Sequence, residues 1–265
     1  MSEWWPAYLG IGAIVGFLAG LLGVGGGAIM VPLLVAVYAA QGLPAEHTLH
    51  FALGTSMATI FFTSLSSTRA HHVRGAVDWT VVRAMSPGIL SGSFAAALVA
   101  GILPTRWLAF VFTGLVTYVA ISMLFDLRPR RTRELPGAGG IFFAGTVIGA
   151  ASSLFAAGGA FLSIPFLTWC NVPLRRAFGT AAANGFPIAL AGTAGYVLQG
   201  WRAEDLSAGA LGFVYLPALG LIVATSMLLA PLGTRVAYRL PVKKLRVIFA
   251  VMMFGLALRM LAKLW

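Results

Sequence analysis

Apolar residues in this sequence form long runs rather than the short alternating patterns of a soluble domain. Most runs contain about 20 residues, the length that an α-helix needs to cross a hydrocarbon core of about 30 Å. Eight of them follow one another, at residues 7–39, 49–68, 81–102, 107–126, 139–169, 177–198, 208–231 and 244–264. The pattern predicts an all-α polytopic membrane protein.

Two of the runs are too long for a single span and are interrupted near their middle. Residues 7–39 contain Gly-Val-Gly-Gly-Gly at 23–27, and residues 139–169 contain Ala-Ala-Gly-Gly-Ala at 156–160. Consecutive glycines cost helix stability and expose the backbone. We therefore expect each run to fold as a hairpin of two short helices, which gives ten helices or half-helices in total.

Three segments of the first half recur in the second half in the same order. Residues 25–34 align with 158–167, residues 51–55 with 176–180, and residues 103–124 with 240–261, at offsets of 133, 125 and 137. Duplication is the best explanation of three matches in one order. We expect two repeats, 1–134 and 135–265, that together form one membrane domain.

The basic residues predict how the two repeats are oriented. If both interrupted runs enter the membrane and return, 14 of the 18 lysines and arginines fall on one side. Basic loops mark the cytoplasmic side, so both termini are expected to be periplasmic in a bacterial inner membrane. Each repeat then has five elements, and an odd number inverts the second repeat relative to the first.

Composition agrees with a membrane location and excludes other classes. Hydrophobic residues make up 59% of the chain and charged residues 9%, and the mean hydropathy is +0.91. The net charge of +11 sits in short loops, which argues against nucleic-acid binding. All seven tryptophans lie at the edges of apolar runs, as in an aromatic belt. The N-terminus lacks a basic signal-peptide region, so the first run is expected to be retained.

The interrupted helices predict a binding site for a small anion. A helix that starts inside the membrane presents free N–H groups and the positive end of its dipole. Two such starts facing each other bind an anion without any arginine. The candidate residues at the two starts are Gly25, Gly26, Gly27, Ala28, Gly158, Gly159 and Ala160. The alternative interpretation is that these glycines only permit close helix crossing.

Few polar side chains lie within the predicted spans. Thr55 and Ser56 in the first repeat, and Thr180 and Asn184 in the second, are candidates to donate to the anion. Hydrogen bonding between helices, or back to a carbonyl four residues earlier, explains them equally well. His71 and His72 follow the second run and are candidates for gating the cytoplasmic mouth, although interfacial histidines often have no such role.

No other chemistry stands out in the sequence. All seven acidic residues lie in loops or at helix edges, which disfavours cation transport and a proton relay. Cys170 is the only cysteine, and no nucleophile–base pair, metal cluster or cofactor motif is present. An anion carrier is therefore the first hypothesis. An anion channel, a membrane-embedded enzyme and a structural scaffold are the alternatives, and the sequence does not indicate an oligomeric state.

At these residues the chain resembles the TauE/SafE family of sulfite and organosulfonate exporters. The resemblance rests on Gly20-x-x-Gly23-x-Gly25-Gly26-Gly27 followed by Val31-Pro32, on Gly54-Thr55-Ser56, on His72-x-x-Gly75-x-Val77-Asp78-Trp79, and on the second-half motif Gly158-Gly159, Ile164-Pro165 and Gly179-Thr180. It implies secondary transport, commonly export, of small sulfur-containing anions such as sulfite or C2 sulfonates. It does not choose one anion.

Overall fold

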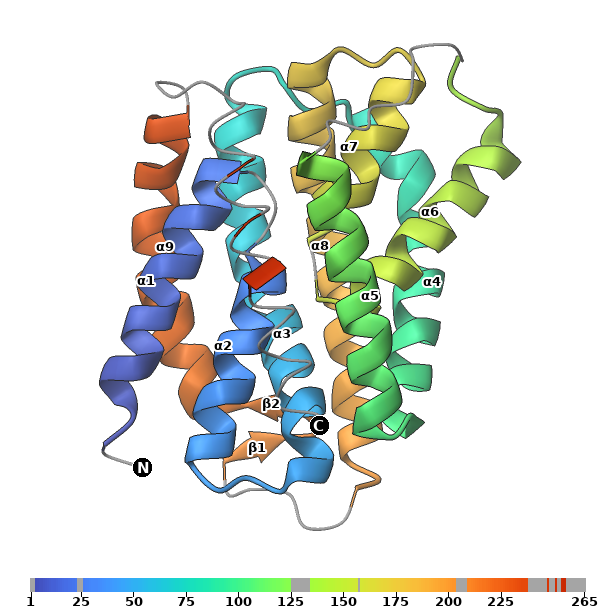
Figure 1. The fold of residues 1–265 in the computed structure, drawn as a ribbon. Coiled ribbons are helices and arrows are strands. Elements are labelled where there is room, and N and C mark those ends of the chain that lie inside the picture. Colours follow the sequence, from blue (N-terminus) through green and yellow to red (C-terminus); the bar gives the residue numbers. More distant parts are fainter. Residues whose placement is uncertain are drawn as a thin grey trace.

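The chain folds almost entirely into α-helices (Figure 1). The computed structural model describes residues 3–22, 26–124, 134–156, 158–203 and 209–237, and the single positions 247, 251, 254 and 255. The elements in these ranges are α1 (Trp5–Leu22), α2 (Gly27–Ala40), α3 (Ala45–His72), α4 (Trp79–Ile102), α5 (Thr105–Leu124), α6 (Ala138–Leu154), α7 (Ala160–Trp169), α8 (Leu174–Gly200), β1 (Ala210–Leu211), β2 (Val214–Tyr215) and α9 (Leu216–Ala237). The predicted span at 244–264 lies outside the described residues except for the four single positions.

The two long runs are each divided at their glycines. The first becomes α1 and α2, and the second becomes α6 and α7. In Figure 1, α2 runs from the interior to the lower end of the molecule, whereas α7 runs from the interior to the upper end. The two short helices therefore point in opposite directions, and both begin inside the fold.

One predicted element begins at the wrong residue. The sequence places a helix over 208–231, but α9 begins at Leu216, and a two-stranded antiparallel hairpin occupies Ala210–Tyr215. The two turn-forming glycines explain the difference. Gly209 and Gly212 have φ angles of 85° and 55°, in the left-handed region that breaks a helix. An apolar run alone does not distinguish a strand pair from the first turns of a helix.

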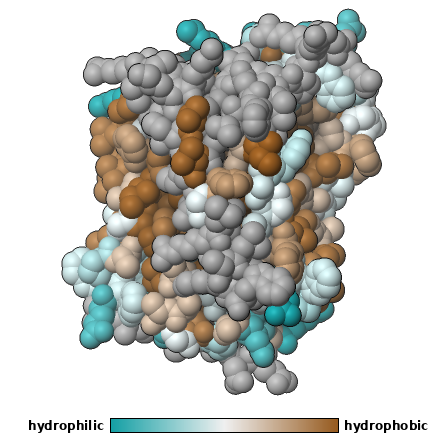
Figure 2. Space-filling view, in the orientation of Figure 1, coloured by the Kyte–Doolittle hydropathy of each residue, from teal (hydrophilic) through white to brown (hydrophobic). Residues whose placement is uncertain are grey.

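The outer surface is suited to lipid. Among the described residues, α3, α4, α8 and α9 contain segments long and apolar enough to cross a membrane. Many large hydrophobic side chains are exposed, including Phe143 and Leu228 at 70% and 74%. Figure 2 shows hydrophobic residues across the middle of the molecule and hydrophilic residues toward its upper and lower ends. This distribution is that of a protein that meets hydrocarbon around its girth and water at both ends.

Two outer helix pairs flank a central pair. α1 packs along α9, α4 packs along α6, and α3 and α8 lie between these pairs (Figure 1). Both outer pairs use glycines to bring their backbones together. A Cβ on Gly16 of α1 would collide with the backbone of Ser226 of α9, and a Cβ on Gly92 of α4 would collide with the backbone of Thr146 of α6. Such close crossings are typical of membrane helices, where small residues allow the contact.

Candidate functional site

The starts of α2 and α7 are built in the same way. Gly26 is the N-cap of α2 with φ 68°, and Gly159 is the N-cap of α7 with φ 77°. Both caps are buried, and neither helix start has a capping side chain. Each helix also carries a proline at its sixth position, Pro32 and Pro165. The first N–H groups of both helices therefore lie inside the protein without a partner from a cap side chain. Gly25 lies outside the described residues.

The two breaks contact each other in the interior. A Cβ on Gly27 would collide with the carbonyl oxygen of Ala156, which ends the segment after α6. Ala156 itself has φ 48°, an unusual conformation for a residue other than glycine. On the other side of the second break, the carbonyl oxygen of Gly158 lies 3.1 Å from where a Cβ on Gly185 of α8 would be. The structure thus brings both breaks against the central helices α3 and α8.

Several polar side chains near these breaks are buried and have no hydrogen-bond partner in the described part of the chain. Ser56 of α3 and Asn184 of α8 are both 0% exposed, and the Ser56 hydroxyl and the Asn184 carbonyl oxygen are unpaired. The Asn184 amide nitrogen donates to the sulfur of Met85, at 3.5 Å. Ser163, in the first turn of α7, is also 0% exposed and unpaired. Ser163 is not among the candidates that the sequence pattern indicates, because nothing in the sequence marks it as facing the break.

Thr55 and Thr180 are not brought together. Thr55 Oγ1 accepts hydrogen bonds from the hydroxyl of Tyr38, at 3.2 Å, and from the backbone N–H of Tyr215, at 3.0 Å. Thr180 Oγ1 accepts from the backbone N–H of Asp78, at 3.0 Å. Tyr215 and Asp78 lie directly before α9 and α4, which begin at opposite ends of the molecule (Figure 1). Both threonines therefore join elements of the fold.

A cavity of about 190 Å³ leads from one end of the molecule to the second break. Arg74 and Arg235 line it at the end where α3 and α9 finish, and Gly158 and Ile60 line it in the interior. Its α3 wall is rich in hydroxyl groups. The hydroxyl residues of this wall are Thr63, Ser64, Ser66 and Ser67. A hydroxyl-rich run at 63–68 is visible in the sequence, but which of its side chains face a cavity depends on the packing of α3 against α9.

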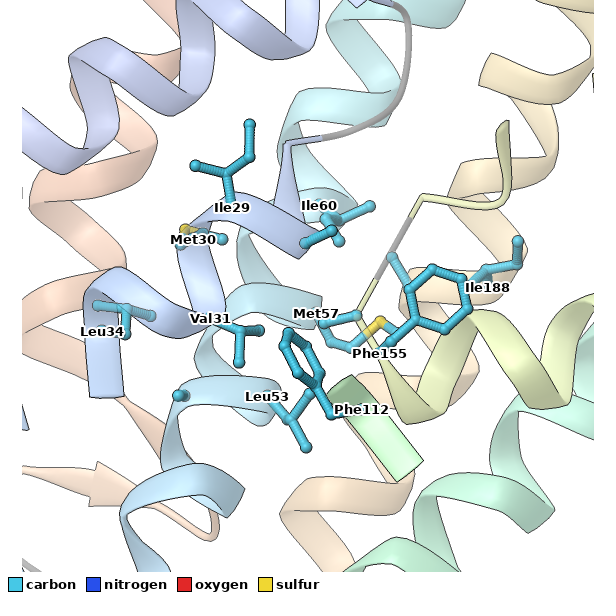
Figure 3. Packing of buried hydrophobic residues seen from close by; sticks show 14 of the residues in the cluster. Ile29, Met30, Val31, Leu34, Leu53, Met57, Ile60, Phe112, Phe155 and Ile188 are labelled. Atoms are coloured by element: carbon cyan, nitrogen blue, oxygen red, sulfur yellow. The ribbon is translucent and has the colours of Figure 1, made fainter. Parts of the chain in front are cut away.

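An apolar layer of described residues lies on the other side of this cavity. Val31, Leu53, Met57, Phe112 and Phe155 are at most 1% exposed. Figure 3 shows these side chains gathered between α2, α3, α5 and the segment after α6. Leu53 and Met57 precede the cavity residue Ile60 along α3, so the layer lies on the side away from the arginines. Among the described residues, the layer lies between the cavity and the end at which α1 begins.

A second cavity, of about 210 Å³, lies at that other end. Its lining is aromatic and includes Trp4, Trp5, Tyr8 and Tyr215, together with Gln41. The Gln41 amide donates to the Tyr8 hydroxyl at 2.7 Å. The two cavities therefore differ in chemistry, because only the first is lined by arginines.

The two histidines lie at the arginine-rich end. The ring of His72 accepts a hydrogen bond from the indole N–H of Trp79, at 3.1 Å through Nδ1, and packs edge-on against the same indole. His71 is half-buried in the last turn of α3. Neither histidine lines the arginine-rich cavity, whereas Arg74 does.

The chain is similar to a known transporter family over nearly its whole length. The sequence model of the sulfite exporter TauE/SafE family matches residues 8–260. A probable membrane transporter protein of Haemophilus influenzae is 34% identical over 255 residues, which cover 96% of each chain. A probable membrane transporter protein of Methanocaldococcus jannaschii is 26% identical over 97% of this chain and 95% of its own. No solved structure matches the chain significantly.

Proposed function

Because the chain belongs to the sulfite exporter TauE/SafE family and is a membrane transporter, we propose that it exports small sulfur-containing anions such as sulfite or C2 organosulfonates. The proposed location is the bacterial inner membrane, with both termini in the periplasm. In this proposal the protein is a carrier and catalyses no chemical reaction.

The main support for the proposal is the arginine-rich cavity, which extends from one end of the molecule to the second break. Arg74 and Arg235 give its mouth a positive potential, and the hydroxyl-rich α3 wall offers donors along the way to Gly158. Positive charge around a concave opening raises the local concentration of anions. A cation would meet no carboxylate among the described residues of this path, because none of those that line it is acidic.

The proposed binding site lies beyond the cavity, between the starts of α2 and α7. The N–H groups of Gly27, Ala28 and Ala160 belong to first helical turns, which favour anions. The hydroxyls of Ser56 and Ser163 and the carbonyl oxygen of Asn184 add buried polar groups that lack partners in the described chain. An anion would supply acceptors for the serine hydroxyls and for the weakly paired Asn184 amide.

The arrangement of the helices supports two inverted repeats, 1–134 and 135–265. The outer pairs α1–α9 and α4–α6 each join the first element of one proposed repeat to the fourth element of the other. Gly26 matches Gly159, and Pro32 matches Pro165, in both sequence offset and position in the helix. The opposite directions of α2 and α7 are what an inverted second repeat requires.

The described arginines support the proposed orientation. Six of them, Arg69, Arg74, Arg83, Arg175, Arg176 and Arg235, lie at or near the end where α3 and α9 finish, and Arg106 and Arg202 lie at the other. The positive-inside rule assigns the first end to the cytoplasm. The cavity then opens inward and the apolar layer closes the outward path. A carrier that alternates between two open sides has this form, whereas a conducting channel needs a continuous path.

Uptake into proteoliposomes tests the proposal. Radiolabelled sulfite, isethionate and sulfoacetate would be offered to the wild type and to Gly26→Val and Gly159→Val, since valine strongly disfavours the positive φ of both caps. Gly114→Val is the matched control, because nothing lies within 4 Å of a Cβ there. We expect saturable uptake that the two cap variants abolish and the control retains, with folding checked by size exclusion. Absence of transport for all three anions would contradict the substrate class, and chemical turnover of the bound anion would identify an enzyme.

A milder variant tests the cavity without disturbing the backbone. Arg235→Gln removes one charge from an exposed side chain at the mouth. We expect KM to rise severalfold at low ionic strength and the difference to shrink in salt, because screening shortens the reach of the arginine to about 10 Å at 0.1 M. Arg106→Gln, at the other end, is the control. An equal change in both variants would show that the cavity does not recruit the anion.

A further inference from the structure

The segment before α9 rests on a glycine–threonine pair of α3. A Cβ on Gly54 would collide with the carbonyl oxygen of Phe213. One residue further along α3, Thr55 Oγ1 accepts the backbone N–H of Tyr215 at 3.0 Å. Tyr215 is the last residue before α9 and, like Thr55, is buried. The close approach and the hydrogen bond together hold the N-terminal end of α9 against α3.

The segment before α4 rests on α8 in the same manner. A Cβ on Gly179 would collide with the carbonyl oxygen of Ala76, and Thr180 Oγ1 accepts the backbone N–H of Asp78 at 3.0 Å. Asp78 is the last residue before α4 and caps it by accepting from the N–H groups of Thr80 and Val81. In both places a backbone carbonyl packs against the glycine, and the backbone N–H of the residue two positions after that carbonyl donates to the threonine hydroxyl. We call these the α9 junction and the α4 junction.

The arginine-rich cavity opens at the far end of α9 from its junction. Ala230, Pro231 and Arg235, in the last two turns of α9, line the cavity across from Ser64 and Ser67 of α3. α9 is thus joined to α3 near its first residue and separated from α3 by the cavity near its last turns. The corresponding pair, α4 and α8, is packed together more extensively. The α9 junction and the α4 junction are both formed in this structure. Of the two helices, α9 borders the arginine-rich cavity and α4 does not.

We propose that Gly54-Thr55 and Gly179-Thr180 are the two pivots of the transport cycle, about which α9 and α4 swing while the junctions themselves stay formed. This inference rests on the proposed carrier function. Swinging α9 about Tyr215 opens or closes the cytoplasmic mouth between α3 and α9. Swinging α4 about Asp78 opens the opposite end between α8 and α4. The threonines then position moving helices and do not bind the anion.

A gate and a pivot respond differently to a covalent tether. A tether across a gate stops transport, whereas a tether across a pivot leaves the swing free. The junction tether would be His47→Cys with Phe213→Cys, whose native rings lie 5.6 Å apart beside the α9 junction, closed by oxidation to a disulfide. These positions leave Gly54, Thr55 and the backbone N–H of Tyr215 intact. The mouth tether would be Ser67→Cys with Pro231→Cys, joined by a short bifunctional thiol reagent. Both pairs would be made in a Cys170→Ser background, because Cys170 is the only native cysteine.

We expect the mouth tether to abolish sulfite uptake and the junction tether to leave at least about half of the initial rate. Each double variant before cross-linking is its own control. Loss of uptake with the junction tether, to the degree seen with the mouth tether, would overturn the proposal.

Hydrogen exchange provides a readout that needs no substrate. The amides of Tyr215 and Asp78 should exchange equally slowly whether or not the mouth is tethered, because pivots persist in both states. Thr55→Val should speed exchange at Tyr215 alone and Thr180→Val at Asp78 alone, each by about tenfold, since each removes the acceptor of one buried N–H. Faster exchange at either amide on tethering the mouth would contradict the pivots. If untethered protein transports none of the sulfur anions, the proposed function fails, and the exchange comparison still decides the pivots.

Discussion

Individual residues near the two breaks are polar groups buried without hydrogen-bond partners in the described chain, which costs free energy. A buried polar group without a partner costs about 1–3 kcal/mol. Ser56, Ser163 and Asn184 are all completely buried, and the two hydroxyls and the Asn184 carbonyl oxygen are unpaired within the described chain. Ser93 of α4 is also buried and unpaired, but it faces Gly149 of α6 in the outer pair. Position therefore separates the polar groups of the proposed anion site from one in the contact between α4 and α6.

Asn184→Leu distinguishes a binding residue from a structural one. Leucine has a similar volume and removes an unpaired carbonyl oxygen, so we expect the thermal midpoint to stay the same or rise. Transport should weaken, with KM rising by about tenfold, since a hydrogen bond to a charged group is worth about 1.5–3 kcal/mol. Thermal unfolding in detergent and uptake kinetics measure the two effects. Ser93→Ala is the control and should leave KM unchanged. If Asn184→Leu lowers stability and leaves KM unchanged, the side chain is structural.

At the scale of helices, close glycine contacts fix the outer pairs. Gly12, Gly16 and Gly20 lie four residues apart on one face of α1, and a Cβ on any of them would collide with α9. Gly10 lies on another face, with nothing within 4 Å of a Cβ. Glycine is therefore needed for close packing at position 16 but not at position 10. Substitutions at these two positions of α1 can be compared directly.

Gly16→Ala and Gly10→Ala should change stability in opposite directions. Alanine at 16 forces α1 away from the backbone of Ser226, and overpacking of this kind costs about 1–3 kcal/mol. Alanine at 10 adds helix propensity, worth up to about 1 kcal/mol, without a new contact. Thermal unfolding of the two variants in the same detergent measures the difference. Equal thermal midpoints for the two variants would contradict the close packing of α1 against α9.

The sequence predicts most of the helices because each is a local pattern. The limits of α3 and α4 lie within four residues of the predicted ones, and the breaks at Gly26 and Gly159 fall where glycines cluster. The contacts that define the cavity and the junctions are not local. Thr55 and Tyr215 are 160 residues apart in the chain, so neither run of sequence indicates the other. The hydrophobic pattern also does not show which hydroxyls of α3 face water.

The whole molecule has two chemically different ends, and this difference predicts its direction in the membrane. Described arginines are concentrated at the end where the first cavity opens, and aromatic residues line the second cavity at the other end. The apolar layer around Met57 lies between the two cavities. If the arginine-rich end is cytoplasmic, the three regions should differ in their accessibility from the two sides of the membrane.

Single cysteines in the Cys170→Ser background test this orientation. Ser67→Cys lies in the wall of the arginine-rich cavity, Glu46→Cys is exposed at the other end, and Met57→Cys is in the apolar layer. We expect a membrane-impermeant thiol reagent to label position 67 in inside-out vesicles, position 46 in right-side-out vesicles, and position 57 in neither. The charged reagent reaches only thiols in contact with water, so labelling reports which side each region faces. The reverse pattern at 67 and 46 would place both termini in the cytoplasm, and the cavity would then receive anions from outside. Labelling of position 57 from both sides would indicate a water-filled channel in place of a carrier.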